Sequence, residues 1–182
     1  MGQDLATLRR ALRERFPRAV YGQRSGSASL APPGTLCDLV GGPASGKCSL
    51  ALRLLRDTAG PVAYVDVAHE LYPPAAAQAG LDLGRLILCR PGDEIAAIRA
   101  AERLLSGGWV RALVLDRGSR TEPLSAPACH RLRRASREGG ARLLVLAAVA
   151  CEAADSRFRV QPDEGGVLLS PEKSGLLLRI AI

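Results

Sequence analysis

The chain has 182 residues, a hydrophobic fraction of 47% and a formal charge of +7. This length predicts a single domain that can bury a core without metal or disulfide support, and this composition excludes a disordered chain. Aromatic residues make up only 3%, too few for a surface on which single-stranded bases stack.

No signal peptide or membrane span is predicted. The first 15 residues are charged, and no apolar run approaches the roughly 20 residues that cross a bilayer. Five cysteines, without a CxxC pair, fit reduced, buried thiols of a cytosolic protein better than a zinc site. They are Cys37, Cys48, Cys89, Cys129 and Cys151. We therefore expect a cytoplasmic protein.

The first predicted element is a basic amphipathic helix within residues 1–18. Its apolar residues recur at helical spacing between arginines, and Pro17 interrupts the pattern. Two interpretations remain open: the helix packs on its own domain, or it docks on a partner. The residues that would contact a partner are Leu5, Leu8, Arg9, Arg10, Leu12 and Arg13. Residues 19–34, rich in Gly, Ser and Pro, predict a linker to a core domain at 35–182.

Strands and helices alternate after the linker. Near-continuous apolar runs predict strands at 36–40, 62–66, 86–89, 112–116 and 143–147, and helical patterns fall at about 47–57, 74–80, 93–106 and 125–138. This order predicts an α/β fold with a mostly parallel, twisted sheet flanked by helices. Residues 167–170 and 176–182 predict a C-terminal β-hairpin that extends the sheet.

The strongest motif is a phosphate-binding loop that follows the first strand and opens the first core helix. Its backbone N–H groups and helix N-terminus can surround phosphate oxygens, and Lys47 can reach the β- and γ-phosphates. Lys47 is one of only two lysines in an arginine-rich chain. We therefore predict binding of ATP or ADP by Gly41, Gly42, Pro43, Ala44, Ser45, Gly46, Lys47, Cys48 and Ser49.

The predicted magnesium site is only half present. Asp116 ends an apolar strand, where a carboxylate would hold a water molecule of Mg²⁺. The position after Lys47, which should carry a hydroxyl ligand, is Cys48, and a thiol is a poor ligand for this hard cation. We expect weak or vestigial binding of nucleotide with Mg²⁺.

Three collinear segments resemble the RecA recombinase family: residues 33–52 with the phosphate loop, 65–71 and 80–88. The resemblance implies a RecA-like P-loop core. It also shows departures, since the position of the family's water-orienting Glu is Ala68, and residues 146–149 lack its γ-phosphate-sensing Gln. Tyr72 falls where family members contact adenine and could stack on a base.

The two segments that hold DNA in RecA are also altered. The first is short, at 117–127, and the second, at 151–166, keeps Arg157 and Arg159 among acidic residues. We expect weak, non-specific DNA binding at most, with steep salt dependence.

A small, degenerate RecA-like chain resembles the ImuA family of bacterial mutagenesis proteins. This resemblance implies a nucleoid-associated accessory protein of the DNA-damage response, with RecA or a Y-family polymerase-like protein as partner. Two alternatives remain: an active RecA-family ATPase or recombinase paralogue, and a P-loop fold used as a structural module.

Overall fold

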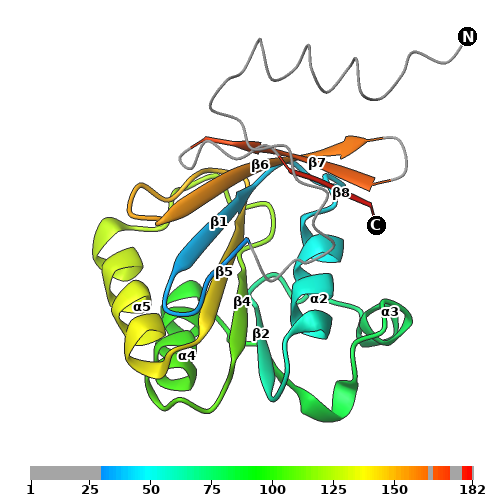
Figure 1. Ribbon diagram of the computed structural model, residues 1–182. Helices are drawn as coiled ribbons and strands as arrows, with labels where there is room; N and C mark the ends of the chain where they lie inside the picture. Colours follow the sequence, from blue (N-terminus) through cyan, green and yellow to red (C-terminus); the bar gives the residue numbers. More distant parts are fainter. Residues whose placement is uncertain (1–29, 164–165, 173–177, 182) are drawn as a thin grey trace, which may run out of the picture.

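An eight-stranded sheet runs through the computed structural model, which describes residues 30–163, 166–172 and 178–181 (Figure 1). The strand order is β3-β2-β4-β5-β1-β6-β7-β8. Pairing is parallel from β3 through β6 and antiparallel at β6–β7 and β7–β8, so the chain ends in a hairpin that extends the sheet. The predicted α/β architecture with its C-terminal hairpin is confirmed.

The strands are β1 (Leu36–Val40), β2 (Val62–Asp66), β3 (Leu86–Cys89), β4 (Ala112–Asp116), β5 (Arg142–Ala147), β6 (Ser156–Asp163), β7 (Gly166–Pro171) and β8 (Leu178–Ala181). The helices are α2 (Lys47–Asp57), α3 (Pro73–Gln78), α4 (Glu94–Ser106) and α5 (Ala126–Gly139), and a 3₁₀ turn η2 (Leu83–Arg85) precedes β3. Every element predicted within the described residues lies within two residues of its expected bounds.

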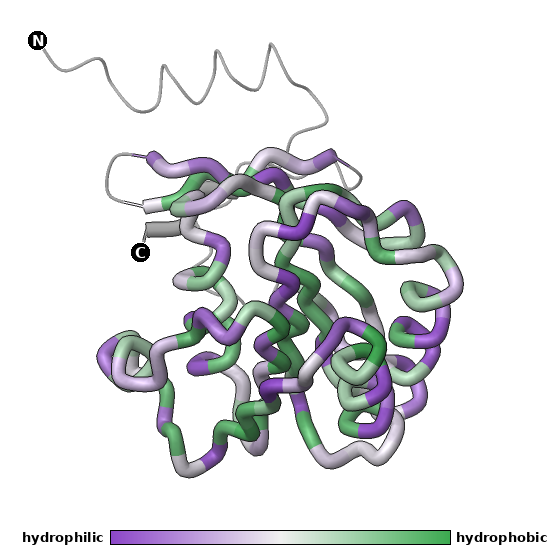
Figure 2. Tube along the Cα trace, turned by 180° about the vertical axis from the view of Figure 1, so that it is seen from behind, coloured by the Kyte–Doolittle hydropathy of each residue, from purple (hydrophilic) through white to green (hydrophobic). Residues whose placement is uncertain are grey.

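Two apolar layers hold the helices against the sheet. Successive strand residues face opposite sides of the sheet. Residues on one side, such as Leu39 and Val114, share a buried cluster with α2 and α3, and residues on the other side, such as Leu36 and Val145, share another with α4 and α5. Figure 1 shows these helix pairs on opposite faces, and Figure 2 shows hydrophobic residues following the central strands. Burial on both faces explains why the parallel strands are near-continuous apolar runs.

Strand β6 corrects one prediction. Residues 151–166, likened to a DNA-binding loop, contain a strand that pairs parallel with β1 and antiparallel with β7. Phe158 and Val160 are buried while Arg159 and Gln161 are exposed, the period-two alternation of a half-buried strand. That alternation was the signal available in the sequence.

The core begins earlier than predicted. Leu30 and Ala31, assigned to the linker, are buried in the cluster beside α2. The predicted amphipathic helix at 1–18 lies outside the described residues, so its two interpretations remain open. Within the described part of the chain, no helix combines the length and apolarity that a bilayer crossing needs.

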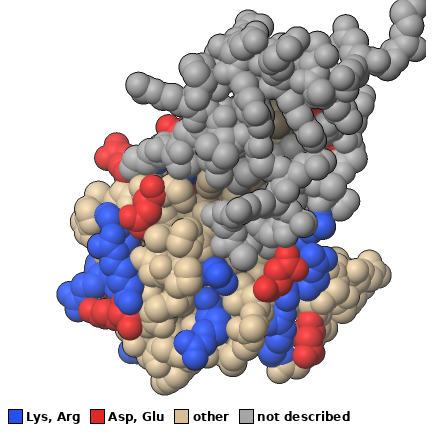
Figure 3. Space-filling model, in the orientation of Figure 1, with Lys and Arg blue, Asp and Glu red and all other residues tan. Residues whose placement is uncertain are grey.

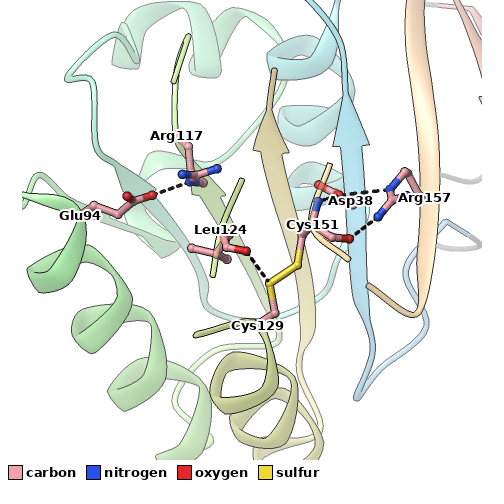
Figure 4. The surroundings of a disulfide bond; sticks show 7 residues. All are labelled: Asp38, Glu94, Arg117, Leu124, Cys129, Cys151 and Arg157. Carbon is pink, nitrogen blue, oxygen red and sulfur yellow. Dashed lines mark hydrogen bonds and ion pairs between the residues drawn. A yellow bond between two sulfur atoms is a disulfide. The ribbon is translucent and has the colours of Figure 1, made fainter. Parts of the chain in front are cut away.

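Two cysteines are joined, which corrects the expectation of free thiols. Cys129 in the first turn of α5 forms a disulfide with Cys151, which lies in the β5–β6 crossover over β1 (Figure 4). The backbone N–H of Cys151 also donates to Asp38 Oδ2 at 2.6 Å. Cysteine spacing alone could not reveal the pair, because the fold brings the two residues onto the same buried face.

Loss of this disulfide should destabilise the protein. A cross-link spanning 22 residues restricts the unfolded chain, so reduction, or the double substitution Cys129→Ala/Cys151→Ala, should lower the free energy of unfolding by about 3 kcal/mol. Urea unfolding of oxidised and reduced protein measures the difference, with Cys89→Ala as the control. Alkylation of five thiols in protein unfolded without reductant would contradict the assignment.

Candidate nucleotide-binding site

The phosphate loop connects β1 to α2, as predicted. Gly46 caps α2 with φ 90°, and Ala44 has φ 54°, so the loop turns through the left-handed region twice before the helix begins. A Cβ on Gly41 would lie 2.7 Å from both Ser45 Oγ and Val160 O, whereas a Cβ on Gly42 would meet no atom within 4 Å. Gly41 therefore lets the loop pack against β6, and Gly42 leaves its outer side open.

Lys47 lies inside this loop. Its Nζ donates to the carbonyls of Gly41 and Gly42, the latter at 2.8 Å, and the residue is 8% exposed. Burial lowers the pKa of this ammonium, while the nearby carboxylates of Asp116 and Glu70 oppose that shift. The only lysine in the described residues is thus held at the position where a phosphate would lie.

Asp116 is placed beside the loop but is already hydrogen-bonded by the protein. Its Oδ2 accepts from the Tyr64 hydroxyl at 2.5 Å and the Cys48 thiol at 3.7 Å, and its Oδ1 accepts from Gly118 N at 2.9 Å. Desolvation and the neighbouring carboxylate raise the pKa of Cys48 to about 11, and the same causes raise that of Tyr64. Both groups are therefore protonated donors at neutral pH.

This donor set does not fit Mg²⁺. The cation needs oxygen ligands in an octahedral arrangement, whereas Cys48 offers a protonated sulfur and Asp116 Oδ2 already has two protein donors. Sequence reasoning anticipated the Cys48 defect but missed Tyr64. A phenol flanked by aliphatic residues in strand β2 was the available signal.

The segment after β2 contains Ala68, the residue predicted to stand at the catalytic position. Asp66, opposite Asp116 in the sheet register, is fully buried and accepts from the backbone N–H groups of Glu70 and Leu71, both at 3.0 Å. These bonds fold residues 67–71 back over the strand end. Ala68 packs closely against Gly118: a Cβ added to Gly118 would lie 2.7 Å from the methyl group of Ala68.

Glu70 is a second residue that sequence reasoning missed. Its nearest carboxylate oxygen would lie 3.8 Å from a Cβ on Gly118, and its charge acts on Lys47. The site therefore has a carboxylate two positions after the substituted Ala68. Its presence in a segment with the expected Glu missing was the available signal.

The remaining predicted site residues lie on α2 and at the start of α3. Ser49 is exposed one position beyond Cys48 on α2. Tyr72 immediately precedes α3 and is 66% exposed, so its ring is open to a stacking partner. His69 has φ 59°, and its Nε2 lies 3.1 Å from Pro91 O, a contact that ties this turn to the end of β3.

Three of the four arginines of the two predicted DNA segments form ion pairs within the protein. Arg157 pairs with the fully buried Asp38 and also donates to Cys151 O, and Arg159 pairs with Glu172 at 2.5 Å. Arg117 is 1% exposed and pairs with Glu94 (Figure 4). On the face seen in Figure 3, cationic groups are separate and interspersed with acidic side chains. These arginines therefore hold the fold together, and the predicted partner residues at 5–13 lie outside the described chain.

A lysine-containing phosphate loop between a buried parallel strand and a helix defines the P-loop α/β class of nucleotide-binding folds. Residues 24–126, more than half of the chain, match the RecA N-terminal domain family. The chain belongs to this family, whose RecA members bind ATP with Mg²⁺.

Individual relatives agree with this assignment. Protein RecA of Ruminococcus albus is 32% identical and that of Gluconobacter oxydans 34% identical, each over 88 residues, or 47% of this chain. The chain spans about a quarter of the length of these relatives, as the match covers 22% and 26% of them. The crystal structure of the RadB recombinase superposes with a TM-score of 0.67 at 21% identity, covering 87% of this chain and 93% of that one. This last likeness shows the shared fold.

Proposed function

We propose that this chain is a RecA-like accessory protein of the DNA-damage response. It binds ATP or ADP weakly, hydrolyses little of it, and modulates RecA, a Y-family polymerase-like protein, or both, as in induced mutagenesis by the ImuA family. One contrast carries the proposal: the phosphate loop keeps its glycines and Lys47, whereas Ala68 stands at the position of the water-orienting acid.

The phosphate loop supplies the binding half of this function. The N–H groups of residues 44–47, at the start of α2, would hold the β-phosphate, and Lys47 would exchange its carbonyl partners for phosphate oxygens. Ala68 can neither accept a proton nor orient water, so the hydrolytic half is weakened.

A partner role follows from the shared core. RecA-like domains associate head to tail, a heterologous contact that grows into a filament. A domain that keeps this core, but cannot complete an ATP-gated contact, would occupy a filament end and stop its growth. The paired arginines of β6 favour a protein partner over DNA, and DNA binding should be weak and salt-sensitive.

One observation favours a second candidate, an active RecA-family ATPase. The Glu70 carboxylate lies over Gly118 and acts on Lys47, so it could orient water in place of the missing acid. In that case Glu70, two residues further along the chain, would take over the water-orienting role of the acid missing at position 68, and ATP turnover would be kept.

Steady-state ATP turnover separates the two candidates. We expect the purified protein to hydrolyse ATP at a rate about 10²–10⁴-fold below that of an enzyme with a positioned acid. Glu70→Gln should leave this low rate unchanged, and Ala68→Glu should raise it partly. Robust turnover that Glu70→Gln abolishes would instead establish the ATPase.

A further inference from the structure

Two protonated side chains converge on the carboxylate that a magnesium ion would use. Cys48 contributes a thiol at the hydroxyl position of the phosphate loop, and Tyr64 contributes a phenol from the middle of β2. Both donate to Asp116 Oδ2, at 3.7 Å and 2.5 Å. They come from separate elements, α2 and β2, and both donate a hydrogen bond to the same oxygen.

The resulting cluster is complete without a metal. Tyr64 is fully buried and Asp116 is 4% exposed, so their hydrogen bond is shielded from water. The backbone N–H of Gly118 donates to the other carboxylate oxygen, Asp116 Oδ1, at 2.9 Å. A cation that recruited Asp116 would leave the buried Tyr64 hydroxyl without its acceptor, which opposes metal entry.

The loop keeps its other means of holding phosphate. Lys47 and the N-terminus of α2 supply positive charge and N–H donors, and Lys47 donates its hydrogen bonds to loop carbonyls and not to Asp116. Phosphate recognition and metal recognition are therefore separable in this chain, although they act together in proteins with an intact hydroxyl and a free carboxylate.

We propose that this site takes up a nucleoside di- or triphosphate without Mg²⁺, with the Tyr64 and Cys48 protons replacing the cation at Asp116. The inference rests on the proposed function only in assuming that the loop binds nucleotide.

The test is a titration with fluorescently labelled ADP and ATP, in excess EDTA and in excess Mg²⁺, followed by anisotropy. The intact protein should give dissociation constants that agree within about threefold between the two conditions. Mg²⁺ alone should leave its melting temperature unchanged. The double variant Cys48→Thr/Tyr64→Phe restores the hydroxyl and frees Asp116, so its affinity should become at least about tenfold tighter in Mg²⁺.

Matched single variants and a fold check complete the design. Tyr64→Phe alone removes only the competing proton, and Cys48→Thr alone supplies only the ligand, so each should gain less magnesium dependence than the pair. Circular dichroism melting of each variant confirms that it is folded. A tenfold or greater gain in affinity of the intact protein on adding Mg²⁺ would overturn the inference and leave the proposed function standing. Failure to bind in both conditions would overturn both.

Discussion

Replacing Lys47 with alanine should weaken nucleotide binding by roughly 100-fold, because charged hydrogen bonds to phosphate contribute about 1.5–3 kcal/mol each. Lys47 is the only lysine of the described chain and lies inside the loop on the carbonyls of Gly41 and Gly42. The same titration with labelled ADP measures the loss. The fold should survive, since burial of this ammonium is itself unfavourable, as its lowered pKa shows.

The control removes one positive charge elsewhere. Arg134 on α5 is 81% exposed and pairs only across one helical turn with Glu138, so Arg134→Ala should leave nucleotide affinity within about twofold of that of the intact protein. Equal affinities for Lys47→Ala and the intact protein would mean that the loop is not the nucleotide site.

Replacing Arg157 with leucine should lower the free energy of unfolding by about 3–5 kcal/mol, because it leaves the buried carboxylate of Asp38 without its ion-pair partner. Asp38 is fully buried and Arg157 is 14% exposed, so the pair is shielded from solvent. Arg157 also donates to Cys151 O, which adds a lost hydrogen bond. Urea unfolding at neutral pH measures the effect.

The neighbouring arginine on β6 provides the control. Arg159 is half exposed and pairs with Glu172 at the surface, so Arg159→Leu should cost under about 1 kcal/mol. Similar losses for the two variants would contradict a structural role specific to Arg157.

The Arg157→Leu variant should also respond to pH. Burial raises the pKa of Asp38 above its ordinary value, and Arg157 opposes this rise, so the substitution raises that pKa further. When the pKa of a carboxyl is higher in the folded than in the unfolded protein, the folded protein is destabilised as pH rises toward that folded-state pKa. The deficit should therefore shrink in acid, where folded Asp38 is protonated, and unfolding curves at several pH values test this.

The periodicity of the sequence was sufficient for most of the fold. The central parallel strands are buried on both faces, so uninterrupted apolar runs located them, and glycine-rich turns marked their ends. Strand β6 was missed because only its Phe158 and Val160 face the core, and because residues 151–166 were likened to a DNA-binding loop of the RecA family. That resemblance was given more weight than the local alternation.

The part of the site that is contiguous in sequence was predicted, whereas contacts between residues far apart in the sequence were missed. The phosphate loop is contiguous, so spacing alone defined it. The Tyr64–Asp116 contact spans 52 residues and depends on the pairing of β2 with β4, and Cys129 meets Cys151 only through the packing of α5. No local pattern encodes such contacts.

The most direct test of the account is to add the intact protein to RecA assembling on single-stranded DNA and to measure filament growth and RecA ATP turnover. A domain that binds a filament end acts at a low molar ratio to RecA, so substoichiometric protein should shorten the filaments and reduce ATP turnover. Adding more free RecA should not quickly restore filament growth. Unchanged filament length and turnover, with no binding to RecA, would contradict the role of RecA modulator and leave only the polymerase partner.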